Sequence, residues 1–261
     1  MIFDTHAHYD DHAFDEDREA HLASLSLHNV GKMIDVASTP ESIGRVKEIA
    51  DTHDFAYGAV GLHPDEVGKL TAQIKDEICA CLNDPKIVAI GEIGLDYHWD
   101  IEPHDVQIRC FKEQIQLALD AAMPIIVHSR TAAADTMAVI SELYGTGRGA
   151  EIPRKGVIHA YPGSLEQARQ YTSLGFYLGI GGVITYPTAK KLKKVVQGIS
   201  ADHLLLETDC PYLTPEPHRG ERNSSVYLNE VVRTIAEIKN MTVEEVEAVT
   251  WRNACELFGI R

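Results

Sequence analysis

Four histidines and two carboxylates of this sequence stand at the ends of short apolar runs, where each could serve as a metal ligand. Such runs predict buried strands, and a ligand-type residue at the end of one strand could arise by chance. Repetition over five runs indicates one site where the strands end, made of His6, His8, Glu92, His128, His159 and Asp209. This mixed set suits Zn²⁺, Mn²⁺, Ni²⁺ or Fe²⁺ better than Ca²⁺, which prefers oxygen ligands alone.

The first apolar run contains a His-x-His pair, His6 and His8. Side chains alternate along a strand, so both rings face the same side. A lone strand histidine is more often packed or hydrogen-bonded than metal-bound, whereas the pair favours a metal site. Asp4 lies two residues before His6 and faces the same side of the strand. We expect its carboxylate to orient one of these rings without binding the metal itself.

Glu92 lies in the apolar run 87–95, where an unpaired charge would be costly to bury. One alternative is a buried salt bridge, and the other is a carboxylate that bridges two divalent cations. Two such cations would activate a water molecule, and Asp209 is predicted to accept its proton. Glu92 and Asp209 are therefore the predicted catalytic residues. Glu207 has the parity of Asp209 and is expected to act as a supporting base or to hold a further cation.

These residues need a scaffold that brings distant strand ends together. The strands are predicted at 2–8, 32–38, 56–62, 87–94, 124–128, 155–160, 176–181 and 204–209. Eight strands that alternate with helices predict an α/β fold, a (β/α)8 TIM barrel with its chemistry at the carboxyl ends of the strands. An open doubly wound sheet is the rival, but its glycine-rich turn after the first strand is absent here.

Helix signals agree with this alternation. Apolar residues recur at helical spacing in 108–121, at Ile108, Phe111, Ile115 and Leu119. Thr39-Pro40 and Ser164 are typical of helix starts. Two further helices are expected in 226–258, and no change of composition divides the chain, so we expect a single domain over 1–261.

Composition limits the classes of function. Lys and Arg total 24 against 39 Asp and Glu, a net charge of −15, which opposes non-specific binding along a duplex. It does not exclude an enzyme that holds a strand end, because bound cations reverse the local charge. There is no apolar run of membrane length and no leader pattern, and the five cysteines form no Cys-x-x-Cys pair. A cytoplasmic protein with reduced thiols, no membrane contact and no obligate protein partner is expected.

Ordered sequence blocks resemble those of TatD-family metal-dependent deoxyribonucleases and hydrolases, members of the amidohydrolase superfamily. The blocks cover almost the whole chain and begin at Asp4, Gly61, Gly91, His128, Glu207, His218 and Asn253. The resemblance implies that the six residues above bind metal. It also implies hydrolysis of DNA stimulated by Mg²⁺ or Mn²⁺, often from a 3′ end. Two departures concern the substrate: His159-Ala-Tyr-Pro-Gly replaces the usual block, and Glu221 stands where the family often has Lys or Gln.

Five residues are predicted to contact substrate. Guanidinium groups match phosphate oxygens, and exposed aromatic or imidazole side chains can contact bases or leaving groups. The residues are His63, Tyr97, Arg130, Arg219 and Arg222. The alternatives are surface salt bridges for the arginines and structural packing for Tyr97. The basic run 189–194 is interpreted as a solvated helix face.

The sequence thus favours a two-metal phosphodiesterase that acts on DNA ends or single strands, as a 3′–5′ exonuclease. A small-molecule hydrolase of the same superfamily, acting on an amide, lactone or phosphoester, is the main alternative, and the net charge favours it. An inactive barrel used as a binding module is disfavoured because the ligand set is complete.

Overall fold

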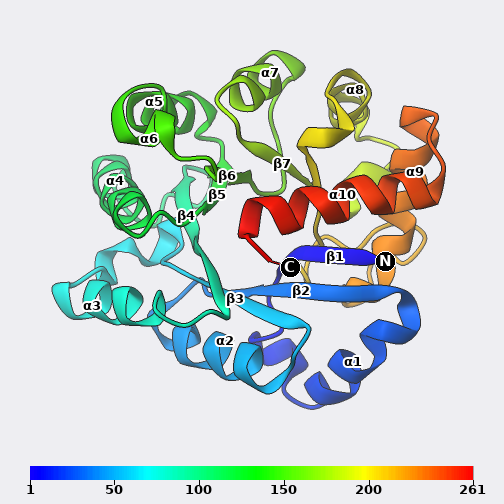
Figure 1. The fold of residues 1–261 in the computed structure, drawn as a ribbon, viewed down its shortest axis with the longest axis horizontal. Coiled ribbons are helices and arrows are strands. Elements are labelled where there is room, and N and C mark those ends of the chain that lie inside the picture. The colour runs from blue at the N-terminus through cyan, green and yellow to red at the C-terminus, as the bar shows by residue number, and fades with distance from the viewer. Residues whose placement is uncertain (261) are drawn as a thin grey trace.

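The computed structural model describes residues 1–260 and contains an eight-stranded sheet in the order β1 to β8, with all neighbouring strands parallel. Contacts between the first and last strands close it: Ala7 pairs with Cys210, and Thr5 Oγ1 donates to Leu206 O at 2.9 Å. The predicted TIM barrel is confirmed (Figure 1). The strands are β1 (Ile2–Ala7), β2 (Val30–Val36), β3 (Ala56–Val60), β4 (Ile87–Asp96), β5 (Ile125–Arg130), β6 (Gly156–Ile158), β7 (Tyr177–Ile180) and β8 (Leu204–Leu206).

Helices alternate with the strands and surround the barrel (Figure 1). They are α1 (Arg18–Ser24), α2 (Pro40–Thr52), α3 (Ala72–Cys81), α4 (His104–Ala121), α5 (Ala133–Tyr144), α6 (Gly147–Glu151), α7 (Leu165–Ser173), α8 (Lys190–Gly198), α9 (Leu228–Lys239) and α10 (Val243–Phe258). Within residues 1–260, none of the helices has the length and apolar content needed to cross a bilayer.

Two of the helix starts predicted from the sequence are confirmed by their hydrogen bonds. Thr39 caps α2 in a reciprocal capping box with Ser42, and Pro40 occupies the first turn. Ser164 caps α7 in the same way with Gln167. These local bonds satisfy amides that the helix itself leaves free, which explains why they could be recognised without knowledge of the fold.

The strand bounds differ from the predicted ones, and three of these differences shape the rim. The strand β4 continues to Asp96, whereas β6 and β8 end at Ile158 and Leu206, before the residues expected to end them. Ala160 and Asp209 have positive φ angles of 40° and 58°, which no regular strand contains. His159 and Asp209 therefore stand on the first turns after their strands.

The C-terminal helix α10 covers the amino-terminal end of the barrel, where it lies beside β1 in Figure 1. Its buried residues Leu257 and Phe258 join Phe3, Val88 and other strand residues in one apolar cluster. Asn253 Nδ2 donates to Ala201 O and Leu204 O at 2.8 and 2.9 Å and so fixes the helix against β8. Because this end is filled, the opposite, carboxyl end is the open one.

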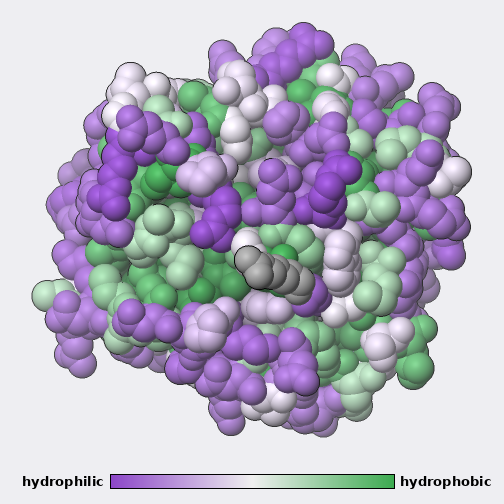
Figure 2. All heavy atoms as spheres, viewed as in Figure 1, coloured by the Kyte–Doolittle hydropathy of each residue, from purple (hydrophilic) through white to green (hydrophobic). Residues whose placement is uncertain are grey.

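Figure 2 shows the face that carries α10 as mostly hydrophilic, with an apolar hollow beside the C-terminus. A hollow of about 450 Å³ at this end is lined by Val88 of β4, Met123 of the loop before β5, and Ile260 just after α10, among other residues. It lies across the barrel from the predicted ligands.

Candidate metal centre

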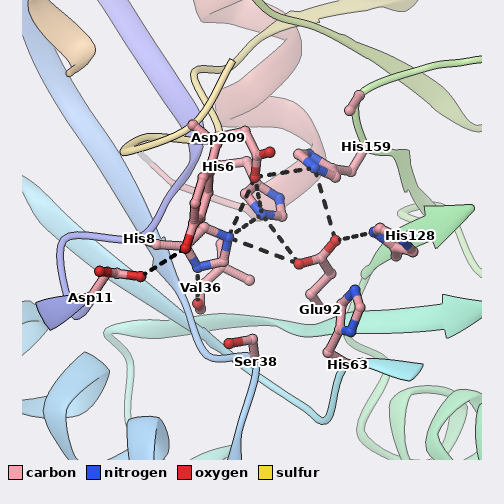
Figure 3. A network of polar contacts seen from close by, with 12 residues as sticks. His6, His8, Asp11, Val36, Ser38, His63, Glu92, His128, His159 and Asp209 are labelled. Atoms are coloured by element: carbon pink, nitrogen blue, oxygen red, sulfur yellow. Dashed lines mark hydrogen bonds and ion pairs between the residues drawn. The ribbon is translucent and has the colours of Figure 1, made fainter. Parts of the chain in front are cut away.

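The six predicted ligands meet at the carboxyl end of the barrel, although they come from five strands (Figure 3). The strands β1, β4 and β5 carry His6, Glu92 and His128, and His8, His159 and Asp209 follow β1, β6 and β8. His6 is fully buried, and Glu92 and His159 are each 4% exposed. The expected convergence of these side chains is thus what the geometry shows.

Three imidazoles surround one oxygen of Asp209. His6 Nε2 and His8 Nε2 lie 3.0 Å apart, and Asp209 Oδ1 is 3.7 and 3.5 Å from them. His159 Nε2 lies 3.4 Å from the same oxygen. Ligands around one cation lie about 3.0–3.4 Å apart when each metal–ligand bond is about 2.1 Å. The four groups are therefore spaced as ligands of a shared metal centre.

Groups behind two of these imidazoles set their protonation. His8 Nδ1 lies 2.8 Å from Val36 O, and because a carbonyl oxygen only accepts, Nδ1 carries the proton. His159 Nδ1 lies 3.2 Å from Glu207 Oε2, an ion-pair contact with the same effect. Once a ring is neutral it turns an Nε2 lone pair inward, which is the form that a metal ligand requires. The donor set fits a divalent transition metal.

The Glu92 carboxylate separates the imidazoles into two pairs (Figure 3). Its Oε2 lies 3.6 and 3.9 Å from the Nε2 atoms of His6 and His8. Its Oε1 lies 2.7 Å from His128 Nδ1 and 3.8 Å from His159 Nε2. A carboxylate placed in this way can offer one oxygen to each of two cations.

A second cluster adds His63, which we expected to contact substrate. Ligand-type atoms of His63, Glu92 and His128 lie within 4.8 Å of one another. Asp65 N donates to His63 Nδ1 at 3.2 Å, so the proton of the neutral ring is on Nε2. Burial lowers the pKa of His63 to about 4, which keeps the ring neutral at pH 7.

Asp96 was missed in the sequence. Its Oδ2 lies 3.1 Å from His128 Nε2, and its Oδ1 accepts from His98 N at 2.8 Å. Asp96 therefore joins the ring of a metal-ligand candidate to the loop after β4. The sequence contains a signal for it, because Asp96 lies an even number of residues after Glu92 and so faces the same side of the strand. In the structure Asp96 is buried like Glu92, at 1% exposure.

Comparison with known proteins identifies the family of this chain. The family described as TatD related DNase matches residues 3–259. The uncharacterized metal-dependent hydrolase YabD of Bacillus subtilis is 42% identical over all of both chains. The crystal structure of YjjV, a TatD homologue from Escherichia coli K12, superposes with a TM-score of 0.91 at 32% identity, over 100% of this chain and 98% of that one. The chain belongs to the TatD family.

Membership of the TatD family makes this protein a metal-dependent hydrolase. An uncharacterized amidohydrolase from Saccharomyces cerevisiae shares the fold, with a TM-score of 0.81 at 17% identity over 98% of this chain and 99% of that one. At this identity the likeness concerns the fold alone. Residues at the carboxyl rim of the barrel would contact the substrate.

The TatD-type rim presents two arginines without an acidic partner. Arg130 ends β5 and lies over the exposed Trp99 ring, with its Cζ 5.2 Å from the centroid. Arg219 lies over Tyr186 in the same way, at 4.4 Å. Across the described part of the chain, no carboxylate oxygen is within 4 Å of either guanidinium. Both groups are free to meet a phosphate.

Arg222 and Tyr97 are half-buried and bonded to other residues of the chain. Arg222 Nη2 donates to Asp17 Oδ2 and lies against His21 Nε2, both at 2.6 Å. Tyr97 Oη donates to Asp135 Oδ2 at 2.8 Å, and its ring stacks on His104 with centroids 3.6 Å apart. Their contacts with substrate stay predictions. Each side chain would have to break the bonds described above before it could contact substrate.

Two further carboxylates lie close to the ligands, and the structure changes the role expected for one of them, Asp4. Asp4 does not touch an imidazole ring: its Oδ2 accepts from Thr208 Oγ1 at 2.7 Å and from Ser225 Oγ at 2.6 Å. It therefore orients the loop that carries Asp209, and our expectation that it orients a histidine ring was wrong. Glu207 Oε1 accepts from Ala160 N at 2.5 Å, while Oε2 lies 3.2 Å from His159 Nδ1 with no hydrogen bond. Ligand-type atoms of His6, His159 and Glu207 lie within 4.8 Å of one another, so the expectation that Glu207 acts as a supporting base or holds a further cation stays a prediction.

Proposed function

We propose that this protein is a phosphodiesterase that uses two divalent cations, Mg²⁺, Mn²⁺, Zn²⁺ or Ni²⁺, to remove nucleotides from the 3′ ends of single DNA strands. The observation that carries the proposal is the Glu92 carboxylate, which turns one oxygen toward each pair of imidazoles. The printed description of the matching family, TatD related DNase, supports DNA as the substrate.

Cations bound there would lower the pKa of a water molecule and neutralise phosphate charge. Asp209 turns Oδ1 to the imidazoles, and its side chain is 19% exposed at the mouth, where it can accept the proton of the attacking water. His63, neutral with its proton on Nε2, can donate to the leaving oxygen. The Arg130 guanidinium can pair with a neighbouring phosphate.

The exposed Trp99 ring next to Arg130 favours single strands. It is 59% exposed and stands on the loop that Asp96 fixes, two residues beyond Tyr97. Unpaired bases stack on such rings without regard to sequence, whereas paired bases do not present their faces. A free guanidinium and an exposed ring together suit a phosphate followed by an unpaired base.

The experiment measures hydrolysis by purified protein with Mg²⁺, Mn²⁺ and Zn²⁺ in turn. Substrates are single-stranded DNA, duplex DNA and a panel of small amide, lactone and phosphate esters, with DNA labelled at either end. Stepwise shortening from the 3′ end supports the proposal. Hydrolysis of the small esters alone would establish the second candidate, a small-molecule hydrolase, which the net charge of −15 favours.

Arg130→Ala and Arg222→Ala distinguish the two kinds of arginine. Loss of one charge-assisted bond to phosphate costs about 1.5–3 kcal/mol, or about 10- to 150-fold in kcat/KM on DNA. We expect this loss for Arg130→Ala, together with a weaker dependence on salt. Arg222→Ala should mainly lower the melting temperature, because its guanidinium is bonded within the chain. An equal reduction of kcat/KM on DNA in both variants would indicate that Arg222 also contacts phosphate.

A further inference from the structure

A cavity of about 330 Å³ opens beside Asp209, on the side of the metal centre away from Arg130. The ends of β6, β7 and β8 and the first turn of α8 enclose it. Its walls include Ala160, Tyr161, Val183, Ala189, Leu192 and Leu213. This volume is at the lower end of the range for small-molecule sites, which take a ring system rather than an ion.

Most polar groups in the cavity wall have partners, and the unbonded Glu207 Oε2 is buried beneath the wall. Tyr161 Oη donates to Ser164 O at 2.7 Å, and Thr208 Oγ1 donates to Asp4 Oδ2 at 2.7 Å. Glu207 holds Ala160 N and faces His159. Gly179 and Gly181 contribute no side chain to the wall. What remains for an occupant is mostly apolar surface, so the fitting group is uncharged.

The residues at the two ends of the cavity favour a neutral group that is covalently joined to an anion. At one end stands Asp209, a member of the metal centre. At the rim Lys191 Nζ donates to Pro162 O at 3.0 Å and keeps two of its three donors free. A neutral ring inside the cavity, joined to a phosphate at the metal end, suits both the apolar wall and the metal centre.

We propose that this cavity, the nucleoside pocket, binds the sugar and base of the terminal nucleotide whose phosphodiester bond is hydrolysed. The inference rests on the proposed function and assigns the part of the substrate that the pocket takes. A base enters only after it has left its stack, at a cost of a few kcal/mol in a duplex. The pocket thus gives a second reason for preferring unpaired ends.

Strands that lack the terminal base test the pocket. Three oligonucleotides are compared: an intact strand, one with an abasic nucleotide at the 3′ end, and one with it at the 5′ end. We expect removal of the base at the cleaved end to lower kcat/KM by at least about 10-fold, as the loss of burial of one ring would. Cleavage of intact and abasic ends at equal rates would overturn the pocket while leaving the nuclease function standing.

Filling the cavity provides the matched variants. Ala189→Phe places a ring in the pocket, and it should bring the ratio of intact to abasic cleavage close to one. Lys194→Phe adds the same ring to an exposed position of α8 outside the wall and should keep the wild-type ratio. Melting curves of both variants check that they are folded.

Calorimetric titration tests the pocket without hydrolysis. In the presence of Mn²⁺, thymidine 5′-monophosphate should bind wild-type protein at least about 10-fold more tightly than 2-deoxyribose 5-phosphate, and Ala189→Phe should abolish this preference. Equal affinities in the wild type would overturn the pocket. If no DNA is cleaved at all, the proposed function fails, and this titration alone decides whether the pocket takes a nucleoside.

Discussion

Glu92 is a buried carboxylate that meets imidazoles on both of its oxygens. Burial opposes its ionisation, yet His128 and His6 hold the pKa of Glu92 well below its usual range. The group is therefore charged before any cation arrives, and a charge at this depth needs partners on each side. Position and charge together suit a bridging ligand.

Glu92→Gln removes that charge and nearly preserves the shape. We expect a folded protein with fewer bound cations and a kcat reduced by at least about 100-fold, the scale of losing one preorganised electrostatic contact. Metal content is measured by mass spectrometry beside the rate. Asp65→Asn serves as the control, since Asp65 lies near His63 but outside the ligand set. Wild-type rate and metal content in Glu92→Gln would exclude the bridging role.

Two imidazoles carry protons that a cation must displace. Burial opposes protonation of His8, but Asp209 and Asp10 raise its pKa to about 10. Burial also opposes protonation of His128, but Glu92 and Asp96 raise its pKa to about 9. At pH 7.5 both rings are therefore charged in the metal-free protein, and a metal ligand must be neutral.

Binding of Mn²⁺ at pH 7.5 should consequently release protons, and the affinity should rise with pH up to about 10, the pKa of His8. The measurement is titration calorimetry in buffers of different ionisation enthalpy, whose slope gives the number of protons released. A binding enthalpy that is the same in every buffer would show that no proton leaves and would contradict these protonation states.

At the scale of elements, the two ends of the barrel have separate tasks. The helix α10 fills the amino-terminal end with apolar side chains, while loops after the strands hold the ligands at the other end. The turn after β8 is fixed from below, because Thr208 N donates to Asp4 Oδ1 at 3.0 Å. Substitutions that disturb packing at the closed end should therefore lower the free energy of unfolding more than they lower kcat.

Phe258→Ala tests that division. Phe258 is 3% exposed in the cluster under the barrel, and removing its ring should lower the free energy of unfolding by about 3–5 kcal/mol. The kcat of the protein that remains folded should stay near the wild-type value. Glu256→Ala, an exposed change in the same helix, should alter stability by less than about 0.5 kcal/mol. Denaturant unfolding gives both values. A loss below about 1 kcal/mol for Phe258→Ala, a third of the lower limit for a buried ring, would show that α10 does not close the barrel.

At the scale of the molecule, acidic charge is abundant, with a net charge of −15. Within the metal centre, Glu92, Asp209 and the nearby Asp96 and Glu207 add to it. Divalent cations would offset this local charge and bind the folded chain alone, because the unfolded chain has no assembled site. Stability and metal occupancy should therefore be linked.

Removal of metal with a chelator should lower the melting temperature, and Mn²⁺ should restore it. A cation at about 100 times its Kd stabilises the folded state by about 2.7 kcal/mol. Scanning calorimetry over a series of Mn²⁺ concentrations measures the shift, with Ca²⁺ as the comparison ion that this donor set should bind less well. A melting temperature independent of Mn²⁺ would mean that the assembled ligands do not hold it.

The sequence by itself determined the barrel and the six ligand candidates. Alternating apolar runs define strands locally, and the parity of His6 and His8 requires no knowledge of distant contacts. Parallel strands joined by helices then leave few ways of arranging their ends, so residues far apart in the chain could be assigned to one rim. The lengths of β6 and β8 were less accessible, because left-handed turns at Ala160 and Asp209 end the strands early.

Only the tertiary structure decided what surrounds each side chain. Arg222 and its partner Asp17 are 205 residues apart, and no local pattern distinguishes it from the free Arg130. The pairing of Asp96 with His128, the loop fixed by Asp4 and the cavity beside Asp209 likewise depend on contacts between different strands and loops. Periodicity shows which way a side chain faces along its own element, but the distances and angles that set hydrogen bonds, charge and shape arise only when the elements pack together.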